Sequence, residues 1–177
     1  MTDVKTLIFE PGEDVPNNPE LPVLILKGVM AGLDAGPIRD RMEANGWGGT
    51  WTWTVFDYHH YHPNAHEALA VATGDAELLL GGPGGECVTV RAGDCLILPA
   101  GTGHKLQRSS DDFRVCGAYP PGQEDFETRR AEDGIGDSRE RIARVELPRT
   151  DPTEGPDGPL VRYWGQDCQT GGRRASV

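Results

Sequence analysis

The chain has 177 residues with a formal net charge of −11 at pH 7, and 25% of its residues are charged. This length predicts one domain with its own hydrophobic core, and the acidic balance excludes nucleic-acid binding, which needs clustered lysine and arginine. The longest apolar stretch, residues 21–33, is interrupted by Pro22, Lys27 and Gly28 and is too short to cross a bilayer, so no membrane partner is expected. Four cysteines without CxxC spacing and the lack of a signal peptide predict a cytoplasmic protein with reduced thiols.

The N-terminal part of the chain predicts two strands and one helix. Residues 4–10 alternate weakly between apolar and polar positions, as an edge strand does, and residues 23–27 form an apolar run of strand length. A helix is expected over residues 37–45, because proline suits its first position, Ile38 and Met42 share one face, and a glycine follows its end.

Residues 51–62 predict a single long strand, because aromatic and β-branched residues are frequent in them. A strand has a side-chain period of two. If this strand is unbroken, every second residue faces the interior of the protein, namely Thr52, Thr54, Phe56, Tyr58, His60 and His62. Trp51 and Trp53 would then point the other way and would need cover from the N-terminal segment or from a second subunit.

Further short strands follow at a spacing of about 8–12 residues, with glycine-rich turns between them. They are predicted over residues 67–73, 75–80, 86–90, 95–98 and 113–118. This pattern, with neither βα alternation nor a repeat, indicates an all-β antiparallel barrel or sandwich. After Pro121 the chain becomes charged, and helices are expected over residues 125–133 and near residues 138–145. Residues 171–177 are expected to form a disordered tail.

All five histidines lie in two short segments, HHYHPNAHE at residues 59–67 and PAGTGHK at residues 99–105. His60 and His62 are two apart, so both imidazoles leave the same face of a strand. Glu67 follows at the start of an apolar run and can return on the neighbouring strand as an oxygen ligand. Histidine is the most common metal ligand in proteins, so this confinement predicts one metal site.

Two spaced motifs around these histidines resemble those of the cupin superfamily. The first reads His60-x-His62-x4-Glu67-x6-Gly74, and the second reads Gly93-Asp94-x4-Pro99-x-Gly101-x2-His104. Thr54 and Arg108 stand where the family usually has a glycine and an asparagine, neither of which is a metal ligand there. The flanking segments PNNPELP at residues 16–22 and GAYPPGQ at residues 117–123 look like those of the YjlB-like single-domain bacterial cupins.

The resemblance implies a double-stranded β-helix, the cupin jelly roll, with a short N-terminal helix and short C-terminal helices. A single cupin domain is expected over residues 1–170, with the metal-binding barrel core at about residues 47–120. A mononuclear metal is implied, held by His60, His62, Glu67 and His104. His59 is expected at the surface, and His66 is expected to face outward unless a bulge at Pro63 turns it toward the metal.

Three neutral imidazoles and one carboxylate form a mixed nitrogen and oxygen donor set. Such a set favours Fe(II) or Mn(II) as the divalent transition metal and also accepts Ni(II), Co(II), Zn(II) or Cu(II). With one divalent ion and Glu67, the ligand shell carries a formal charge of about +1, which favours an anionic or enolisable small molecule as substrate.

The reaction does not follow from the fold, because cupins run dioxygenation, isomerisation, decarboxylation and ligand storage on one scaffold. The leading hypothesis is a dioxygenase-type oxidoreductase in which Glu67 and Tyr58 act in catalysis. A non-redox isomerase or lyase, and a non-catalytic metal or small-ligand binding protein, are the alternatives. A homodimer is expected, because Trp51 and Trp53 face outward in the predicted strand and residues 7–27 have no obvious partner of their own.

Overall fold

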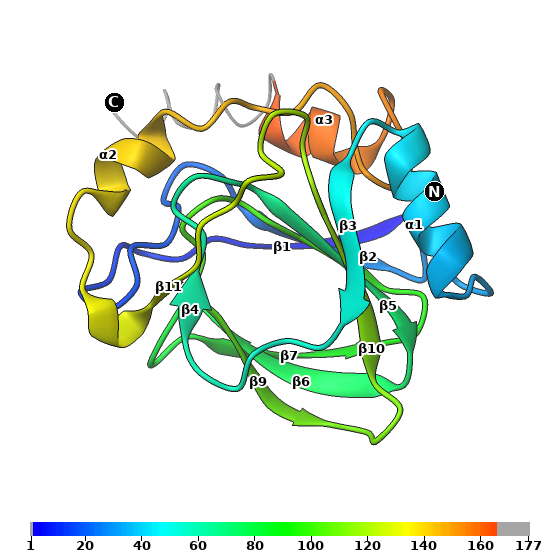
Figure 1. Cartoon of the computed structure of the whole chain (residues 1–177), viewed down its shortest axis with the longest axis horizontal. Coiled ribbons are helices and arrows are strands. Elements are labelled where there is room, and N and C mark those ends of the chain that lie inside the picture. Colours follow the sequence, from blue (N-terminus) through cyan, green and yellow to red (C-terminus); the bar gives the residue numbers. More distant parts are fainter. Residues whose placement is uncertain (1, 166–177) are drawn as a thin grey trace.

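Two antiparallel β-sheets face each other in the computed structural model, which describes residues 2–165 (Figure 1). The six-stranded sheet has the order β1 (Asp3–Leu7), β2 (Val23–Lys27), β8 (Cys95–Leu98), β5 (Glu67–Thr73), β10 (Arg114–Tyr119) and β3 (Gly48–Trp53). The five-stranded sheet has the order β11 (Arg129–Arg130), β4 (His60–Tyr61), β9 (His104–Ser109), β6 (Asp75–Leu80) and β7 (Glu86–Arg91). From β4 to β10 the strands alternate between the sheets, apart from the β6–β7 hairpin, which is the winding of the predicted double-stranded β-helix.

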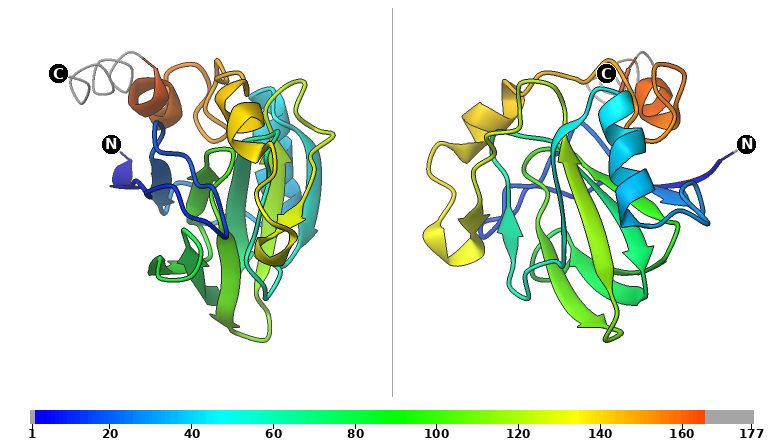
Figure 2. Two further views of the ribbon diagram at one scale, coloured as in Figure 1. Left: turned by 90° about the vertical axis from the view of Figure 1, so that its left-hand side faces the viewer. Right: turned by 45° about the vertical axis from the view of Figure 1, so that its right-hand side comes forward.

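Short helices cover the outside of this barrel. Helix α1 (Ala35–Ala44) packs on the outer face of the six-stranded sheet against β3, β5 and β10 (Figure 2). The predicted N-terminal helix is thereby confirmed, and Ile38 and Met42 are its buried residues. After the barrel come α2 (Ser138–Ala143), which the sequence predicted, and α3 (Pro159–Trp164), which it did not.

Strands β2, β5 and β8 lie in the middle of the six-stranded sheet and bury both of their faces. In β2, Val23 and Ile25 belong to the apolar layer between the two sheets. Leu24 and Leu26 belong to a second apolar layer on the side of α1 and α3. Strands covered on both faces read as continuous apolar runs, whereas a strand with one solvated face alternates polar with apolar residues.

The predicted long strand over residues 51–62 is wrong. The chain forms β3, leaves regular structure, and resumes only as the two-residue β4. This interruption shifts the side-chain alternation, so that Trp51, His60 and His62 all line the same interior cavity. Trp51 lies opposite Gly117 of β10, and its ring occupies the space of the missing side chain, because a Cβ on Gly117 would lie 2.2 Å from the indole.

The predicted helix over residues 125–133 is also wrong. Arg129 and Arg130 form β11, which pairs with β4, and only a single 3-10 turn follows, at Ala131–Asp133. The edge of β4 offers unpaired backbone groups, and pairing with it outweighs the weak helical preference of a short charged segment. Residues 123–130, called the strap below, therefore follow an irregular and extended course beside β4 (Figure 1).

The two observations that predicted a homodimer are upheld only for Trp53. Trp51 faces the barrel interior, and the N-terminal arm finds its partners within the chain, since β1 pairs with β2 and β2 pairs with β8. Trp53 is 55% exposed, so one of the two indoles does reach the surface. The homodimer itself stays a prediction, which light scattering at micromolar concentration would check.

Three further expectations from the sequence concern thiols, membranes and the tail. Cys87, Cys95 and Cys116 are free thiols in β7, β8 and β10. Within residues 2–165, no helix combines the length and the apolar character that a membrane span requires. The tail predicted over residues 171–177 lies outside the described residues.

Candidate metal centre

Three histidines and one glutamate converge inside the barrel. His60 in β4 pairs directly with His104 in β9. His62 follows β4, and Glu67 is the first residue of β5. All four side chains are buried, and one ring nitrogen of each histidine lies within 4.8 Å of the other two. The carboxylate of Glu67 lies 3.3 Å from His62 Nε2 and 3.2 Å from His104 Nε2, so the four residues predicted as ligands come together.

The turn before β9 explains the spacing of the second motif. Gly101 has a φ of 91°, in the left-handed region that glycine adopts at little cost. A Cβ on Gly101 would lie 2.8 Å from the carbonyl oxygen of Asn17, so a side chain would not fit. The Gly101 N–H donates to the carbonyl of His62 at 2.9 Å. This bond ties the turn that carries His104 to the segment that carries the other two histidines.

Each of the three imidazoles is oriented by a backbone carbonyl. The Nδ1 atoms of His60, His62 and His104 lie 2.9, 2.9 and 3.0 Å from the carbonyl oxygens of Tyr58, Glu127 and Thr102. A carbonyl oxygen only accepts, so each Nδ1 carries the hydrogen and each neutral ring presents an unprotonated Nε2. A partner of this kind is what a metal-ligating histidine requires of its second nitrogen.

The unprotonated Nε2 atoms of His62 and His104 face the carboxylate of Glu67, so hydrogen-bond acceptors lie opposite one another with no hydrogen between them. Within the described residues, His62 Nε2 and Glu67 Oε1 are buried and have no hydrogen-bond donor. Buried acceptors without a donor are costly, and lone pairs 3.2–3.3 Å apart repel. A cation at this position would satisfy all of them at once. The donor set and its unsatisfied atoms therefore fit a bound metal ion.

The pKa values show the same conflict in electrostatic terms. Burial, together with the nearby His104, lowers the pKa of His60 to about 2. Burial also acts to lower the pKa of His62, but the Glu67 carboxylate outweighs it, so this pKa is raised. For Glu67, burial acts to raise the pKa, yet His62 and His104 hold it well below its usual value. Without a cation, the Glu67 carboxylate therefore favours a proton on His62.

Sequence reasoning missed Tyr119, which contacts the site directly. Its hydroxyl donates to Glu67 Oε2 at 2.5 Å and accepts from the Trp51 indole N–H at 2.9 Å. Burial and the adjacent Glu67 carboxylate raise the pKa of Tyr119, so the hydroxyl keeps its proton and stays a donor. The sequence signal was its position two residues after Gly117 in an alternating strand, on the face that meets the interior.

The other residues singled out from the sequence lie outside this cluster. Tyr58, predicted as catalytic, is not among the residues that line the cavity, and its ring stacks on Phe56 and lies under the Arg130 guanidinium. His66 lies outside the metal-ligand cluster, as expected, but it is buried rather than at the surface: its Nδ1 accepts from the Ala100 N–H at 2.8 Å and its ring packs on Trp164. His66 therefore supports the turn rather than the metal site.

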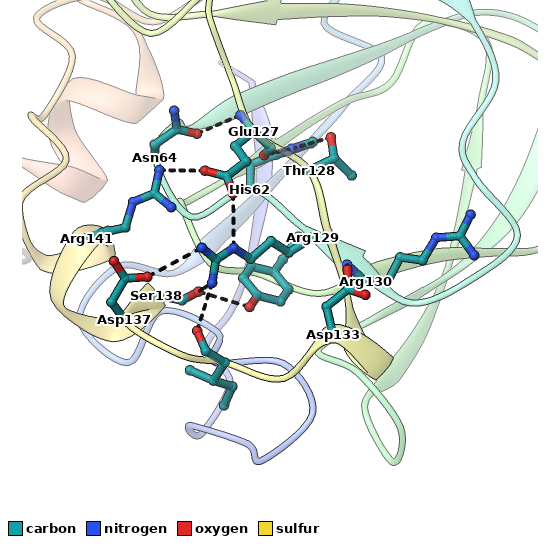
Figure 3. Close-up of polar contacts among 12 residues, drawn as sticks. His62, Asn64, Glu127, Thr128, Arg129, Arg130, Asp133, Asp137, Ser138 and Arg141 are labelled. Carbon is teal, nitrogen blue, oxygen red and sulfur yellow. Dashed lines mark hydrogen bonds and ion pairs between the residues drawn. The ribbon is translucent and has the colours of Figure 1, made fainter.

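The strap supplies the carbonyl that orients His62 (Figure 3). Asn64 fixes its backbone, because the amide oxygen accepts from the Glu127 N–H at 2.8 Å and the amide nitrogen donates to the Asp125 carbonyl at 3.1 Å. The Glu127 carboxylate forms ion pairs with Arg129 at 3.1 Å and with Arg141 at 2.7 Å. Thr128 and Phe126 of the same segment line the cavity.

A cavity of about 250 Å³ opens beside the four converging residues. It contacts His60, His62, Glu67 and His104 at its inner end. The rest of its wall is lined by Trp51, Trp53, Thr54, Val55, Phe56, Leu69, Tyr119, Phe126 and Thr128. Thr54 and Phe56 were predicted to face the interior, and Thr52, predicted with them, is not part of this wall. The cavity therefore joins the four converging residues to a largely aromatic and apolar wall.

Comparison with known proteins agrees with this architecture. Residues 54–116 match the family model described as the cupin domain. A Bacillus subtilis relative, the uncharacterized protein YjlB, is 34% identical over 163 residues, which cover 92% of this chain and 97% of that protein.

Solved structures resemble the chain more distantly. An uncharacterized conserved protein with a double-stranded β-helix domain from Klebsiella pneumoniae has 17% identity and a TM-score of 0.38, and covers 74% of this chain and 80% of its own. Acireductone dioxygenase from Bacillus anthracis, with a cadmium ion in its active centre, has 19% identity and a TM-score of 0.35, with 50% and 60% coverage. The extent of the match to YjlB, together with the cupin motifs, shows that this chain belongs to the cupin family.

Proposed function

We propose that this protein is a mononuclear metal-dependent cupin that acts on a small organic molecule, with dioxygenase-type oxidation as its reaction. The observation that carries the proposal is the common orientation of three imidazoles. Each Nδ1 is held by a backbone carbonyl, so three Nε2 lone pairs and the Glu67 carboxylate point at one place beside a cavity. Side chains that serve only a polar core would find donors instead.

The ligand set proposed for the ion is His60, His62, Glu67 and His104. When bound, a divalent metal supplies a Lewis acid and a template that orients the substrate, and the mixed donor set favours Fe(II) or Mn(II). The chain contributes position and exclusion of water. Tyr119 holds the carboxylate of Glu67 through a hydrogen bond, and the aromatic wall keeps bulk water from the inner end of the cavity.

Metal analysis followed by a reaction screen tests the proposal. Freshly purified protein should contain about one divalent transition metal per chain. Protein loaded with Fe(II), Mn(II), Ni(II) or Co(II) is then offered catechols, small oxo-acids and keto-enols, with oxygen and under argon. Oxygen uptake that depends on substrate supports the dioxygenase. Turnover under argon identifies an isomerase or lyase, and metal-dependent binding without turnover identifies a binding protein.

Two matched substitutions locate the chemistry. Glu67→Gln removes the only anionic side chain among the four proposed ligands and keeps its shape, so it should reduce turnover far more than it reduces the melting temperature. Tyr58→Phe should have a small effect on turnover, because Tyr58 does not line the cavity. If Tyr58→Phe instead abolished turnover at full metal occupancy, the catalytic role predicted for Tyr58 from the sequence would be supported.

A further inference from the structure

The shape and charge of the cavity restrict its ligand to a narrow chemical class. We infer that the ligand is a planar molecule of about one ring, which chelates the metal through two adjacent oxygens and carries a single negative charge, and that dianions are rejected. The inference rests on the proposed function, because it assumes a divalent ion beside Glu67. It adds a substrate class to a site whose reaction is otherwise open.

Size is the first restriction. The cavity measures about 250 Å³, below the range of about 300–1,000 Å³ of pockets that enclose drug-sized ligands. It is large enough for about eight water molecules at the density of the liquid, which corresponds to one ring with small substituents. A nucleotide or another drug-sized ligand would not be enclosed by this volume.

Flatness of the ligand follows from the walls. Five aromatic side chains line the space: Trp51, Trp53, Phe56, Tyr119 and Phe126. Phe126 stacks on Tyr119 with ring centroids 4.1 Å apart, and Phe56 meets Trp53 edge to face at 5.6 Å. Aromatic walls favour a flat apolar ligand, because ring pairs contribute stabilisation beyond the area they bury.

Charge gives the strongest restriction. Among residues 2–165, no lysine or arginine lines the cavity, and the only acidic lining residue is Glu67. A divalent ion with Glu67 leaves a formal charge of about +1, which one negative charge on the ligand would neutralise. A second negative charge would enter an apolar space with no cation to pair with it, which is costly. The Arg130 guanidinium lies over the ring of Tyr58, and neither residue lines the cavity.

The test compares ligands that share a chelating edge and differ in charge. Protein loaded with Co(II) under argon is titrated with tropolone, a planar monoanion at about pH 7.5, and with oxalate, a dianion. The visible absorption of the cobalt reports entry into the ligand shell without any turnover. A second pair, 4-methylcatechol and 3,4-dihydroxybenzoate, places a methyl group or a carboxylate on the same ring. When each catechol chelates the metal with one hydroxyl deprotonated, 4-methylcatechol is a monoanion and 3,4-dihydroxybenzoate is a dianion. The ligand without the additional charge should bind at least about tenfold more tightly in both pairs.

Two variants probe the charge and the wall separately. Thr54→Lys places a cation on the cavity wall, so it should raise the affinity for oxalate by about tenfold and leave that for tropolone nearly unchanged. Phe126→Leu removes one aromatic face and should weaken tropolone binding several-fold with little effect on oxalate. Phe9→Leu is the control, because Phe9 is an aromatic residue that does not line this cavity.

The outcomes separate this inference from the proposed function. If Co(II) does not bind, or binds equally well to His104→Ala, the metal site is absent, and both the proposed function and the inferred ligand class are wrong. If Co(II) binds but oxalate matches or exceeds tropolone in the unmodified protein, the metal site stands and the substrate class is wrong. Retained cobalt is measured after each titration, so that removal of the metal by a chelator is not counted as binding.

Discussion

Two regions of the molecule orient the same kind of ligand in different ways. His60 and His104 donate their Nδ1 hydrogens to carbonyls only two residues earlier in the chain, those of Tyr58 and Thr102. His62 donates to the carbonyl of Glu127, which lies 65 residues later in the strap. Two imidazoles are thus oriented by the backbone just before their own strands, and the third depends on a segment that folds back from beyond the barrel.

The difference has an energetic side. The two local bonds each join residues two positions apart at the start of β4 or β9, and both strands belong to the five-stranded sheet. Apart from the stacking of Phe126 on Tyr119, the strap is held by polar contacts, and the side chain of its central residue, Glu127, is 42% exposed. Exposed ion pairs contribute little, about 0–1 kcal/mol each, so the strap should open locally more easily than the barrel.

The largest effect is expected when His104, one of the two imidazoles oriented within the barrel, is removed. His104→Ala removes one of three clustered imidazoles and should strip most of the metal, whereas His59→Ala should keep it, because His59 is not part of the cluster. Elemental analysis after dialysis measures both variants. Full metal occupancy in His104→Ala would show that the ligand set is wrong.

The pKa values of His60 and His62 are shifted in opposite directions, so pH should affect these two imidazoles differently. The pKa of His60 is lowered to about 2, so this ring stays neutral, whereas the pKa of His62 is raised above its ordinary value of 6.5. In metal-free protein, the proton on His62 contributes stability that is fully present below about pH 6.5 and is lost as the pH rises through the raised pKa. Metal must displace this proton, so metal affinity should rise with pH by up to about tenfold per unit until that pKa is passed.

Titration of the imidazole resonances by NMR in metal-free protein measures both histidines directly. A metal affinity that is flat between about pH 6 and 8 would contradict the assignment of His62 as a proton-competing ligand. The same result would remove the contrast between the barrel side and the strap side.

An intermediate effect is expected when the strap is loosened. Asn64→Ala deletes both bonds that fix the backbone around Glu127, and changes in groups that orient a metal ligand cost about 10–100-fold in affinity. We expect the lower end, about tenfold, because the Arg129 and Arg141 contacts remain. Asn45→Ala is the matched control, since it deletes a similar bond, to Pro152, away from the metal centre.

Equal metal affinities in Asn64→Ala and Asn45→Ala would show that the strap does not position His62. Hydrogen exchange of the strap amides in the same two proteins separates loosening of the strap from global destabilisation, because only Asn64→Ala should raise exchange there selectively.

The smallest effect is expected from Tyr119→Phe, which acts on the barrel side through the carboxylate. The change removes the hydroxyl between the Trp51 indole and Glu67 and keeps the ring stacked on Phe126. Metal affinity should fall several-fold, because Glu67 loses the bond that orients it. The free energy of unfolding should fall by about 1–3 kcal/mol, because buried polar groups lose their partner. Calorimetry checks both quantities. A metal affinity unchanged in Tyr119→Phe would mean that Glu67 needs no support from this hydroxyl.

Much of the barrel could be predicted from local patterns. The strands β5, β6 and β8 were predicted with their bounds, and α1 nearly so, because their apolar runs end at glycine or at charged turns. The two wrong predictions, the long strand over residues 51–62 and the helix over residues 125–133, share a cause. The break after β3 and the strand β11 depend on which backbone edges and which small residues, such as Gly117, the rest of the fold places opposite them. Local preference carries no information about such partners.

The sequence by itself determined the cupin motifs, the alternation of His60 and His62, and the turn that brings His104 beside them, because each depends on residues close together in the chain. Only the tertiary structure decided that Tyr119 reaches Glu67, that Trp51 points inward, and that the strap holds His62. These contacts join residues 52, 68 and 65 positions apart. Their formation depends on how two sheets and a returning segment pack, which no local pattern of side chains specifies.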